Sequence, residues 1–373
     1  MIYLDYQATT PIAPEVAAAM RPWIDSQFAN PHSPHRFGRE AAAAIEIARG
    51  HVAGAIGAKD GKLLFTSGAT EAANWALKGA AAHLPADRRK LVTLATEHAA
   101  VLDTLQWLEG QGFVVDVLPV GGDGLVDLEL AATRIDASTG LVAVMLVNNE
   151  IGVIQPVGAL SALARAQGAL VFCDAVQGLG RVTIPLAACD LVAVSAHKVH
   201  GPKGIGALWV RDGVSLEPLL HGGGQEGGVR SGTLSPALCV GFGEAARLLG
   251  ECGAADRDHV ALLWRTAWAV LGTDWRLNGS AEQRYRGNLN IRCEGVDSAR
   301  LISELREIAF SAGSACASGS GRPSHVLAAL GLSERDARSS IRLGFGRYTS
   351  EEELVRALTL IGDAAARQRS FAA

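Results

Sequence analysis

The sequence predicts a doubly wound α/β domain joined to a smaller α+β unit. Between about residues 60 and 210, short apolar runs alternate with amphipathic segments, and several runs are continuously apolar, as in LVAVMLV (141–147). Continuous apolar runs are typical of strands buried on both faces of a largely parallel sheet. Repeated alternation of strand and helix indicates the doubly wound class, in which ligands bind at the carboxyl ends of the strands.

The large sheet is expected to contain seven strands. They span residues 63–65, 91–95, 114–120, 141–147, 170–174, 191–195 and 205–210. The intervening segments, such as EAANWALKGAAAHL (71–84) and VGALSALARAQG (157–168), repeat apolar residues at intervals of three and four, which predicts amphipathic helices.

The rest of the chain predicts the smaller unit, with helices over 255–270, 298–308 and 351–367 and a strand over 288–291. Two N-terminal helices, near 14–23 and 39–56, are expected to pack against this unit or against a partner subunit. We predict a large domain over residues 15–250 and a small domain formed by 1–14 and 251–373. The Gly-rich segment HGGGQEGGVRSGT (221–233) is a candidate boundary, although its glycines are equally consistent with a function.

Composition excludes several classes of protein. The 34 Lys and Arg against 38 Asp and Glu give a net charge of −4, which argues against nucleic-acid binding. No apolar run reaches the roughly 20 residues that span a bilayer, and the start MIYLDYQATTP lacks the pattern of a signal peptide. The six cysteines show neither CxxC nor metal-ligand spacing, so no metal is expected and the thiols are expected to be free. We therefore expect a cytoplasmic protein.

The segment SAHKVHGPKG (195–204) gives the first strong indication of chemistry. Lys198 follows directly on a buried strand, where a lysine is either a solvated cation or, held by packing, the amine that forms a Schiff base with an aldehyde cofactor. Ser195 and His197 are candidates for holding a phosphate group of such a cofactor.

Four other strands end in suitable side chains. Asp174, in FCDAVQG (172–178), is either a helix cap or a carboxylate facing a pyridinium nitrogen, with Gln177 three residues on. The segment GAT (68–70) opens a helix, either as a plain capping box or as an anion site made of N–H groups and the Thr70 hydroxyl. His98 and Asn149 follow two further strands. Each structural interpretation is reasonable singly, but all five together are improbable.

Two further residues stand apart from the large sheet. Cys316 lies in AFSAGSACASGSGRPSH (309–325), surrounded by small residues and glycine, which is typical of a loop tip rather than a core position. Its structural alternative is an incidental exposed thiol. Arg342, in SSIRLGFGRYT (339–349), offers a fork for a substrate carboxylate, and Arg347 is a competitor for that role.

On these motifs the chain resembles cysteine desulfurases of the iron–sulfur-cluster and nitrogen-fixation branch, which belong to the class V aminotransferase-like group of pyridoxal-phosphate (PLP) fold-type I. The resemblance runs from YLDYQATTP (3–11) to GRYTSEEEL (346–354). Its most specific parts are TSGATE, TEHAAVLD, VNNEIGVIQP, DAVQ, SAHKVHGPKGIGALWV, RSGT and SAGSAC.

The resemblance implies a role for each candidate residue. Lys198 would hold PLP and shuttle protons, Asp174 would pair with the pyridine nitrogen, Gln177 would bond the ring hydroxyl and His98 would stack on the ring. The phosphate would be held by Ala69, Thr70, Ser195 and His197, and by Thr233 of the neighbouring subunit in a homodimer. Asn149 and Arg342 would bind the substrate carboxylate.

The implied reaction removes sulfur from L-cysteine. The Cys316 thiolate would take the sulfur atom, leaving L-alanine and an enzyme persulfide that passes to a scaffold or carrier protein for iron–sulfur assembly or another pathway. A selenocysteine lyase, a class V aminotransferase and a catalytically silent scaffold are the alternatives. One departure from the family is His200, where relatives commonly carry Tyr. It either touches the phosphate region or has no catalytic role.

Overall fold

The computed structural model describes residues 1–312 and 324–372 and confirms the predicted large sheet. Its seven strands lie in the order β2-β8-β7-β6-β5-β3-β4. They are β2 (Lys62–Thr66), β3 (Lys90–Leu94), β4 (Val114–Leu118), β5 (Thr139–Met145), β6 (Leu170–Asp174), β7 (Leu191–Ser195) and β8 (Gly206–Val210). Only β8 runs antiparallel to its neighbours, so the sheet is mixed and mostly parallel.

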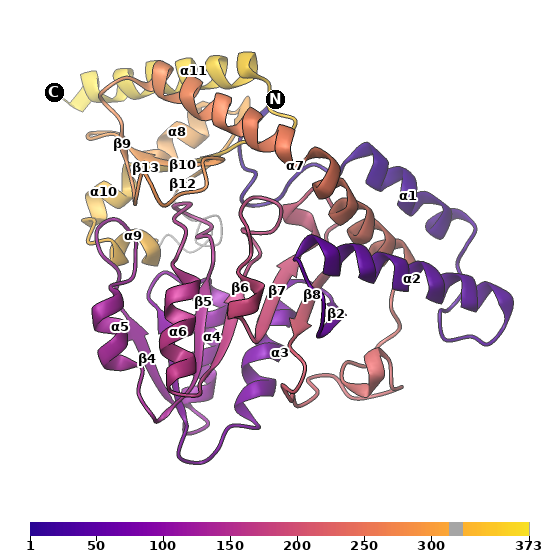
Figure 1. Ribbon diagram of the computed structural model, residues 1–373. Coiled ribbons are helices and arrows are strands. Elements are labelled where there is room, and N and C mark those ends of the chain that lie inside the picture. The colour runs from indigo at the N-terminus through magenta and orange to yellow at the C-terminus, as the bar shows by residue number, and fades with distance from the viewer. Residues whose placement is uncertain (313–323, 373) are drawn as a thin grey trace.

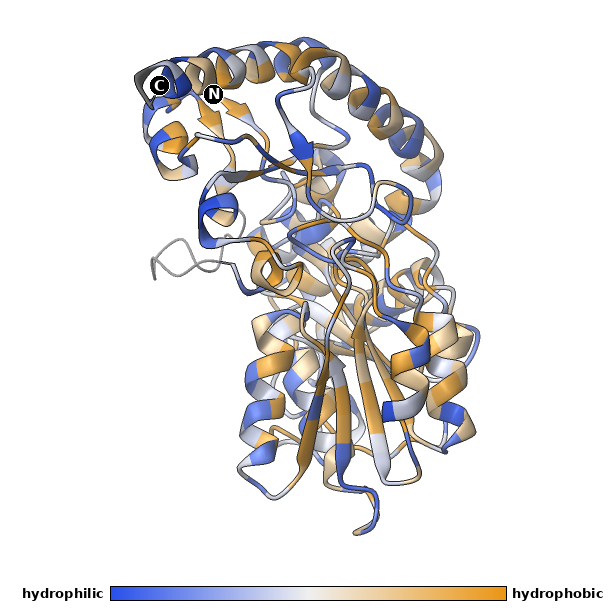
Figure 2. Ribbon diagram, turned by 90° about the vertical axis from the view of Figure 1, so that its left-hand side faces the viewer, coloured by the Kyte–Doolittle hydropathy of each residue, from blue (hydrophilic) through white to orange (hydrophobic). Residues whose placement is uncertain are grey.

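Helices cover both faces of this sheet, as expected for a doubly wound domain (Figure 1). Along β6, Val171 and Cys173 face one core while Phe172 faces the other. The Phe172 side is covered by α3 (Ala69–Ala81) and α4 (Ala99–Glu109). The opposite side is covered by α2 (Arg36–Ala55), α5 (Leu128–Arg134), α6 (Val157–Ala166) and the first half of α7 (Pro236–Leu271). Figure 2 shows the apolar strands enclosed between these helices.

A second, antiparallel sheet lies above the large one (Figure 1). Its order is β12 (Ser311–Ala312), β13 (Ser340–Gly344), β10 (Asn288–Arg292), β9 (Arg276–Leu277). Its core also contains side chains of α8 (Ser298–Glu304), α11 (Glu351–Ala372) and the second half of α7. The remaining elements are α1 (Pro14–Asp25), α9 (His325–Ala329), α10 (Glu334–Arg338) and the parallel pair β1 (Ile2–Tyr3) and β11 (Ile308–Ala309).

Several details differ from the sequence predictions. The helix expected over 298–308 ends at Glu304 and is followed by β11, and the helix expected over 255–270 is the second half of the longer α7. Of the two expectations for the N-terminal helices, packing against the smaller unit is wrong for α2, and packing against a partner subunit stays a prediction. Its residues Ile45, Ala48 and Val52 belong to the core under the large sheet, because they form one apolar stripe that packs on α7.

The boundary between the two predicted domains falls inside α7. Leu248 belongs to the core of the large sheet and Val260 to the core of the small sheet, while the helix runs on without a break. We propose a large domain over residues 15–250 and a small domain formed by 1–14 and 251–373, with α7 extending from the first into the second.

The Gly-rich segment is not a boundary. It lies along the edge strand β2, where Glu226 accepts a hydrogen bond from Phe65 N at 3.1 Å and pairs with Arg49 at 2.7 Å. These contacts hold Glu226 at a φ of 50°, a conformation uncommon outside glycine.

Candidate functional site

The parallel strands bring four of the predicted residues to one edge of the large sheet. His98 follows β3, Asn149 follows β5, Asp174 ends β6 and Lys198 follows β7. The charges of His98 and Lys198 both act on the Asp174 carboxyl, which places these three groups within electrostatic reach of one another. The structure therefore brings His98, Asp174 and Lys198 together, while their roles stay predictions.

Asp174 is a buried carboxyl group at the centre of this edge. Its pKa is raised by burial, while a hydrogen bond from Val176 N at 3.0 Å and the positive charges of His98 and Lys198 oppose the rise. The alternative role as a helix cap does not hold, since a turn follows β6. A desolvated carboxylate of this kind favours a cationic ligand group.

Lys198 points to the N-terminal segment of the chain. Its Nζ donates hydrogen bonds to the backbone oxygens of Gln7 at 2.7 Å and Ala8 at 2.8 Å. The same Gln7 oxygen accepts from Gln177 Nε2 at 2.8 Å. The lysine amine and the Gln177 amide are therefore neighbours, because both bond to the same backbone carbonyl oxygen.

His197 and Ser195 lie on either side of the β7 exit. Ser195 is buried at the end of the strand, and His197 Nδ1 lies 3.2 Å from Thr9 Oγ1. Burial lowers the pKa of His197 to about 4, and the charges of Lys198, Lys203 and Arg181 add to the effect. The imidazole is therefore neutral at pH 7 and able to donate one hydrogen bond.

The start of α3 supplies backbone N–H groups. Gly68 precedes the helix, Ala69 is its first residue, and Thr70 is exposed in the first turn. The first N–H groups of any helix lack intrahelical acceptors and favour an anion. Gly206 of β8 approaches closely here, because a Cβ on it would lie 2.9 Å from Gly68 Cα.

His98 caps α4. Its Nδ1 accepts a hydrogen bond from Ala100 N at 3.1 Å, so in the neutral imidazole the proton is on Nε2. This contact orients a half-buried ring whose charge acts on Asp174, and stacking on the cofactor ring stays a prediction.

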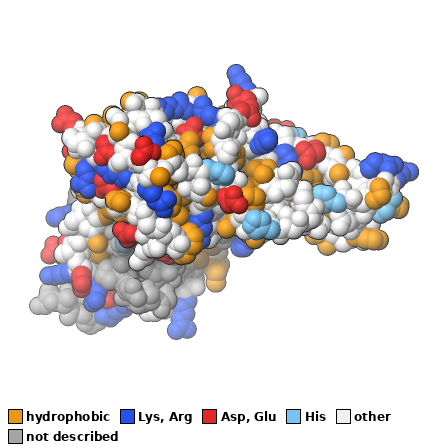
Figure 3. Space-filling view, turned by 90° about the horizontal axis from the view of Figure 1, so that it is seen from below, with side chains coloured by type: hydrophobic (Ala, Val, Ile, Leu, Met, Phe, Trp, Pro, Cys, Tyr) orange, Lys and Arg blue, Asp and Glu red, His pale blue; other side chains and the backbone are white. Residues whose placement is uncertain are grey.

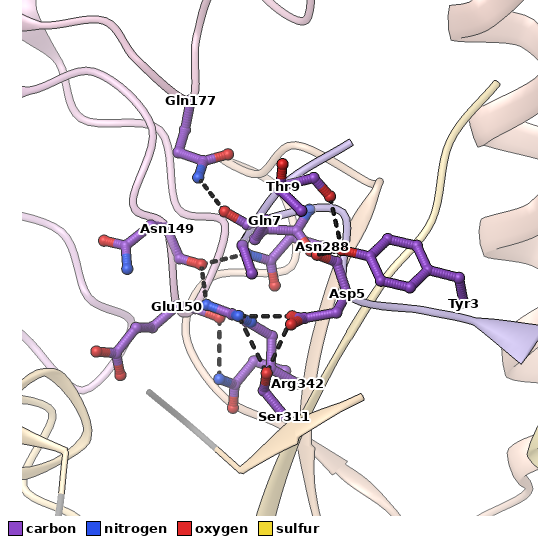
Figure 4. A network of polar contacts seen from close by, with 12 residues as sticks. Tyr3, Asp5, Gln7, Thr9, Asn149, Glu150, Gln177, Asn288, Ser311 and Arg342 are labelled. Carbon is purple, nitrogen blue, oxygen red and sulfur yellow. Dashed lines mark hydrogen bonds and ion pairs between the residues drawn. The ribbon is translucent and has the colours of Figure 1, made fainter. Parts of the chain in front are cut away.

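Arg342 reaches the site from β13 of the small sheet (Figure 4). Its Nη2 lies 2.7 Å from Asp5 Oδ1, and its Nη1 donates to the backbone oxygen of Asn149 at 3.1 Å. The guanidinium is buried, and its Nε has no acceptor among the described residues. Arg342 and Asn149 therefore lie together, and the Nε of Arg342 remains as an unused hydrogen-bond donor within that part of the chain.

Both arginines are ion-paired, but Arg342 keeps an Nε without an acceptor among the described residues, whereas Arg347 is held in a bidentate pair. The Arg347 guanidinium forms a bidentate ion pair with Asp256, with the closest contact at 2.7 Å. Of the two arginines considered in the sequence, the structure favours Arg342 as the carboxylate ligand.

Two predicted residues are not brought to this edge. Thr233 lies on an exposed segment before α7 and, within the described part of the chain, makes no hydrogen bond to the other predicted residues. Cys316 lies outside the residues that the structure describes.

The N-terminal segment from Asp5 to Thr10 lies at the site without having been predicted from the sequence. This segment contacts Arg342 through Asp5, Lys198 and Gln177 through Gln7, and His197 through Thr9 and Thr10. In the sequence, this segment differs from its surroundings only as the polar run YQATT, which follows the apolar start of the chain and has neither helical nor strand periodicity.

Two buried carboxyl groups were also missed. Glu97 accepts from Met145 N at 2.7 Å, and burial raises its pKa well above the usual range. Glu150 accepts a hydrogen bond from Ser324, and its pKa is also raised by burial. Each lies next in sequence to a predicted residue, His98 or Asn149. Their position beside the end of a strand could therefore have marked them as candidate site residues.

The donor set fits pyridoxal phosphate. A buried carboxyl for a pyridinium nitrogen, an amine on the adjacent strand exit and a helix N-terminus with neighbouring hydroxyl and imidazole groups match the three polar parts of that molecule. The amide of Gln177 adds a donor beside the amine.

Comparison with known proteins leads to the same family. The aminotransferase class-V family model matches residues 2–357. The cysteine desulfurase IscS of Rickettsia bellii (strain OSU 85-389) is 45% identical over 368 residues, covering 96% of this chain and 90% of the relative. A solved NifS-like protein superposes with a TM-score of 0.90 at 34% identity, covering 98% of this chain and 99% of that chain.

Another solved structure, described as SspA in complex with cysteine, has a TM-score of 0.84 and 35% identity, covering 94% of this chain and all, 100%, of that chain. These matches extend over nearly the whole chain and agree with the arrangement of the sheet and its carboxyl edge. The chain belongs to the aminotransferase class-V family, whose members have the PLP fold-type I architecture.

Proposed function

We propose that this protein is a PLP-dependent cysteine desulfurase, which converts L-cysteine to L-alanine and a persulfide on Cys316. The observation that carries the proposal is the grouping of Lys198, Asp174, His98 and Arg342 around one edge of the large sheet. The similarity to curated desulfurases over 96% of the chain supports it.

The cofactor supplies an aldehyde that condenses with amines and a ring that accepts the electron pair left at the substrate Cα. Lys198 would bind it and afterwards move the Cα proton. The Asp174 carboxylate would keep the ring nitrogen protonated, Gln177 would donate to the ring hydroxyl oxygen and His98 would stack on the ring. Ala69, Thr70, Ser195 and His197 hold the phosphate through N–H and hydroxyl groups.

The substrate carboxylate is held by Asn149 and Arg342. Sulfur transfer then needs the Cys316 thiolate, whose Sγ forms a bond to the substrate sulfur while the Cβ–S bond breaks. The electron pair of the broken bond stays on the carbon skeleton, which takes up a proton and leaves as alanine. The persulfide passes to an acceptor protein for iron–sulfur assembly or another sulfur-using pathway.

The test combines a spectrum, mass spectrometry and product analysis. Purified protein loaded with PLP and incubated with L-cysteine is expected to gain a mass of one sulfur and, when a thiol reductant is added, to release sulfide in equal amount to alanine. Cys316→Ala is expected to retain the visible absorbance of bound PLP and to lose the added sulfur. Cys252→Ala, which changes a partly exposed thiol elsewhere, is the matched control.

The alternatives give different results. A transaminase would keep its turnover in Cys316→Ala, a silent scaffold would show no visible absorbance, and a selenocysteine lyase would prefer selenocysteine. Any of these outcomes would contradict the proposal.

We also propose that two copies associate, with Thr233 of one chain binding the cofactor phosphate of the other. Thr233 is exposed, and the arm made by α1, α2 and their connection carries large exposed apolar side chains (Figure 3). They are Ile24, Phe28, Phe37 and Ile47, of which Phe28 is 87% exposed. Apolar side chains this exposed mark an association surface.

Light scattering is expected to give twice the 38.8 kDa mass of one chain. Thr233→Ala and Lys198→Ala are each expected to be inactive or nearly so. Mixed and reassociated, they are expected to recover activity, because a hybrid dimer contains one site with both groups intact. Failure of complementation in a confirmed hybrid dimer would place Thr233 elsewhere.

We propose a cytoplasmic location. Cys173 and Cys189 are buried neighbours and both are free thiols, which suits a reducing compartment. Among the described residues, no helix combines the length and apolarity that crossing a membrane requires.

A further inference from the structure

Arg181 is a cation behind the site that the proposed reaction does not use. It lies in the loop after β6, and burial of its guanidinium lowers its pKa. Within the part of the chain that the structure describes, it forms no ion pair with Asp or Glu. Its guanidinium carbon instead lies 5.1 Å from the centre of the Tyr285 ring. A half-buried cation without a carboxylate partner carries a desolvation cost, so its position calls for a functional explanation.

The first consequence of this position concerns Gln177. Arg181 Nη1 donates a hydrogen bond to Gln177 Oε1. An amide has one oxygen acceptor and two N–H donors, and the oxygen is now occupied. One donor of Nε2 bonds the backbone oxygen of Gln7 at 2.8 Å. Arg181 thereby fixes the amide so that its remaining donor is presented beside the Lys198 amine.

The second consequence concerns charge. Arg181 Nη2 donates to the backbone oxygen of Lys198 at 3.0 Å, so a permanent positive charge lies against the lysine's own backbone. Its field already contributes to the lowered pKa values of His197 and His200, both about 4 and both due first to burial. A second cation close to an amine makes the amine easier to deprotonate.

Other groups also act on the Lys198 amine. Asp174 at the end of β6 favours the protonated amine, and the neutral His197 adds no charge. Further titratable or charged groups near the site are His98 at the start of α4, Glu97 before it, Glu150 after β5, Arg342 of β13, Lys203 after β7 and Tyr285 before β10. Asp174, at the end of β6, and Arg181, in the loop that follows, thus have opposite effects on the same amine.

We propose that Arg181 is a positioning residue, which holds Gln177 as a donor toward the ring oxygen of bound PLP and lowers the pH at which the Lys198 nitrogen loses its proton. This inference rests on the proposed function, because it assigns Arg181 to the same lysine and cofactor.

The test is a pH titration of the visible absorbance of PLP-loaded protein. Arg181→Gln keeps hydrogen-bond donors but removes the charge, and it is expected to move the titration midpoint upward by about one pH unit. Arg181→Lys keeps the charge and is expected to restore the midpoint to within about 0.3 unit of the unchanged protein. Arg181→Met serves in place of Arg181→Gln if the latter does not fold.

Arg284→Gln is the matched control. Arg284 is also buried, with burial lowering its pKa to about 9, and it bonds backbone oxygens of Ser280 and Asn278. Its loss is expected to lower the melting temperature and to leave the midpoint unchanged. A midpoint unmoved in Arg181→Gln, or moved equally in Arg284→Gln, would overturn the inference while the desulfurase proposal stands. The absence of any visible PLP band in the unchanged protein would instead count against the proposed function.

Discussion

The two sheets supply the site in different ways. The large sheet contributes residues that follow the ends of parallel strands, such as Asp174 and Lys198, and their shared edge brings them together. The small sheet contributes Arg342 from the middle of β13, where the antiparallel register with β10 sets its direction. Residues at the ends of parallel strands share one edge of the sheet because of the topology alone. A residue inside a strand reaches a given location only when the strand pairing has the right register.

The difference predicts that the small sheet governs substrate affinity more than cofactor binding. Arg342→Lys is expected to raise KM for L-cysteine roughly 30- to 150-fold, since losing charged hydrogen bonds to a carboxylate costs about 2–3 kcal/mol. The PLP spectrum is expected to be unchanged. Steady-state kinetics and an absorbance spectrum measure the two effects.

Arg347→Lys is the control for this change. It removes the bidentate contacts with Asp256, so it is expected to lower the melting temperature slightly and leave KM within about twofold. If both variants raised KM equally, the assignment of Arg342 to the substrate would be wrong.

A second prediction concerns the large-sheet side of the comparison. His200 is buried, its Nδ1 lies 3.0 Å from Pro11 O, and its ring packs edge-on against Tyr348. Burial lowers its pKa to about 4. Because the unfolded state then binds more protons below about pH 6.5, stability is present above that pH and is lost as pH falls toward 4. These contacts favour the interpretation that His200 has no catalytic role.

Urea denaturation at pH 7 and pH 5 measures this effect. The contribution of His200 to the free energy of unfolding is expected to fall by about 1–2 kcal/mol between these pH values. His200→Asn, which tolerates the φ of 65° at this position, is expected to remove that part of the pH dependence. An equal loss of stability in both proteins would refute the assignment to His200.

The smallest expected effect on KM concerns Ser311, in β12 of the small sheet. Ser311 Oγ lies 3.0 Å from Asp5 Oδ1 and 3.3 Å from Arg342 Nη2. Ser311→Ala is expected to raise KM only about two- to fivefold, since one shared hydrogen bond contributes about 0.5–1 kcal/mol. Ser303→Ala removes an exposed hydroxyl of α8 and is expected to change nothing. An effect of Ser311→Ala as large as that of Arg342→Lys would show that the serine itself binds substrate.

The sequence predicted most of the large sheet because its strands are continuously apolar and its helices amphipathic. It did not predict β13, since Arg342 and Ser340 interrupt the apolar pattern of SIRLG although every residue of the strand is buried. It likewise assigned no role to Asp5 or Gln7, because their importance depends on contacts with residues more than a hundred positions away. Periodicity records local burial, and it cannot record such distant pairing.

The pairing of Asp5 with Arg342 joins positions 337 residues apart. During synthesis the first of these residues leaves the ribosome long before the second exists, and N-terminal parts generally fold first. The large sheet can therefore form while the carboxylate pocket is still open. The pocket can close only after β13 has been translated and docked, so a chain that ends before β13 is expected to lack the Asp5–Arg342 pair.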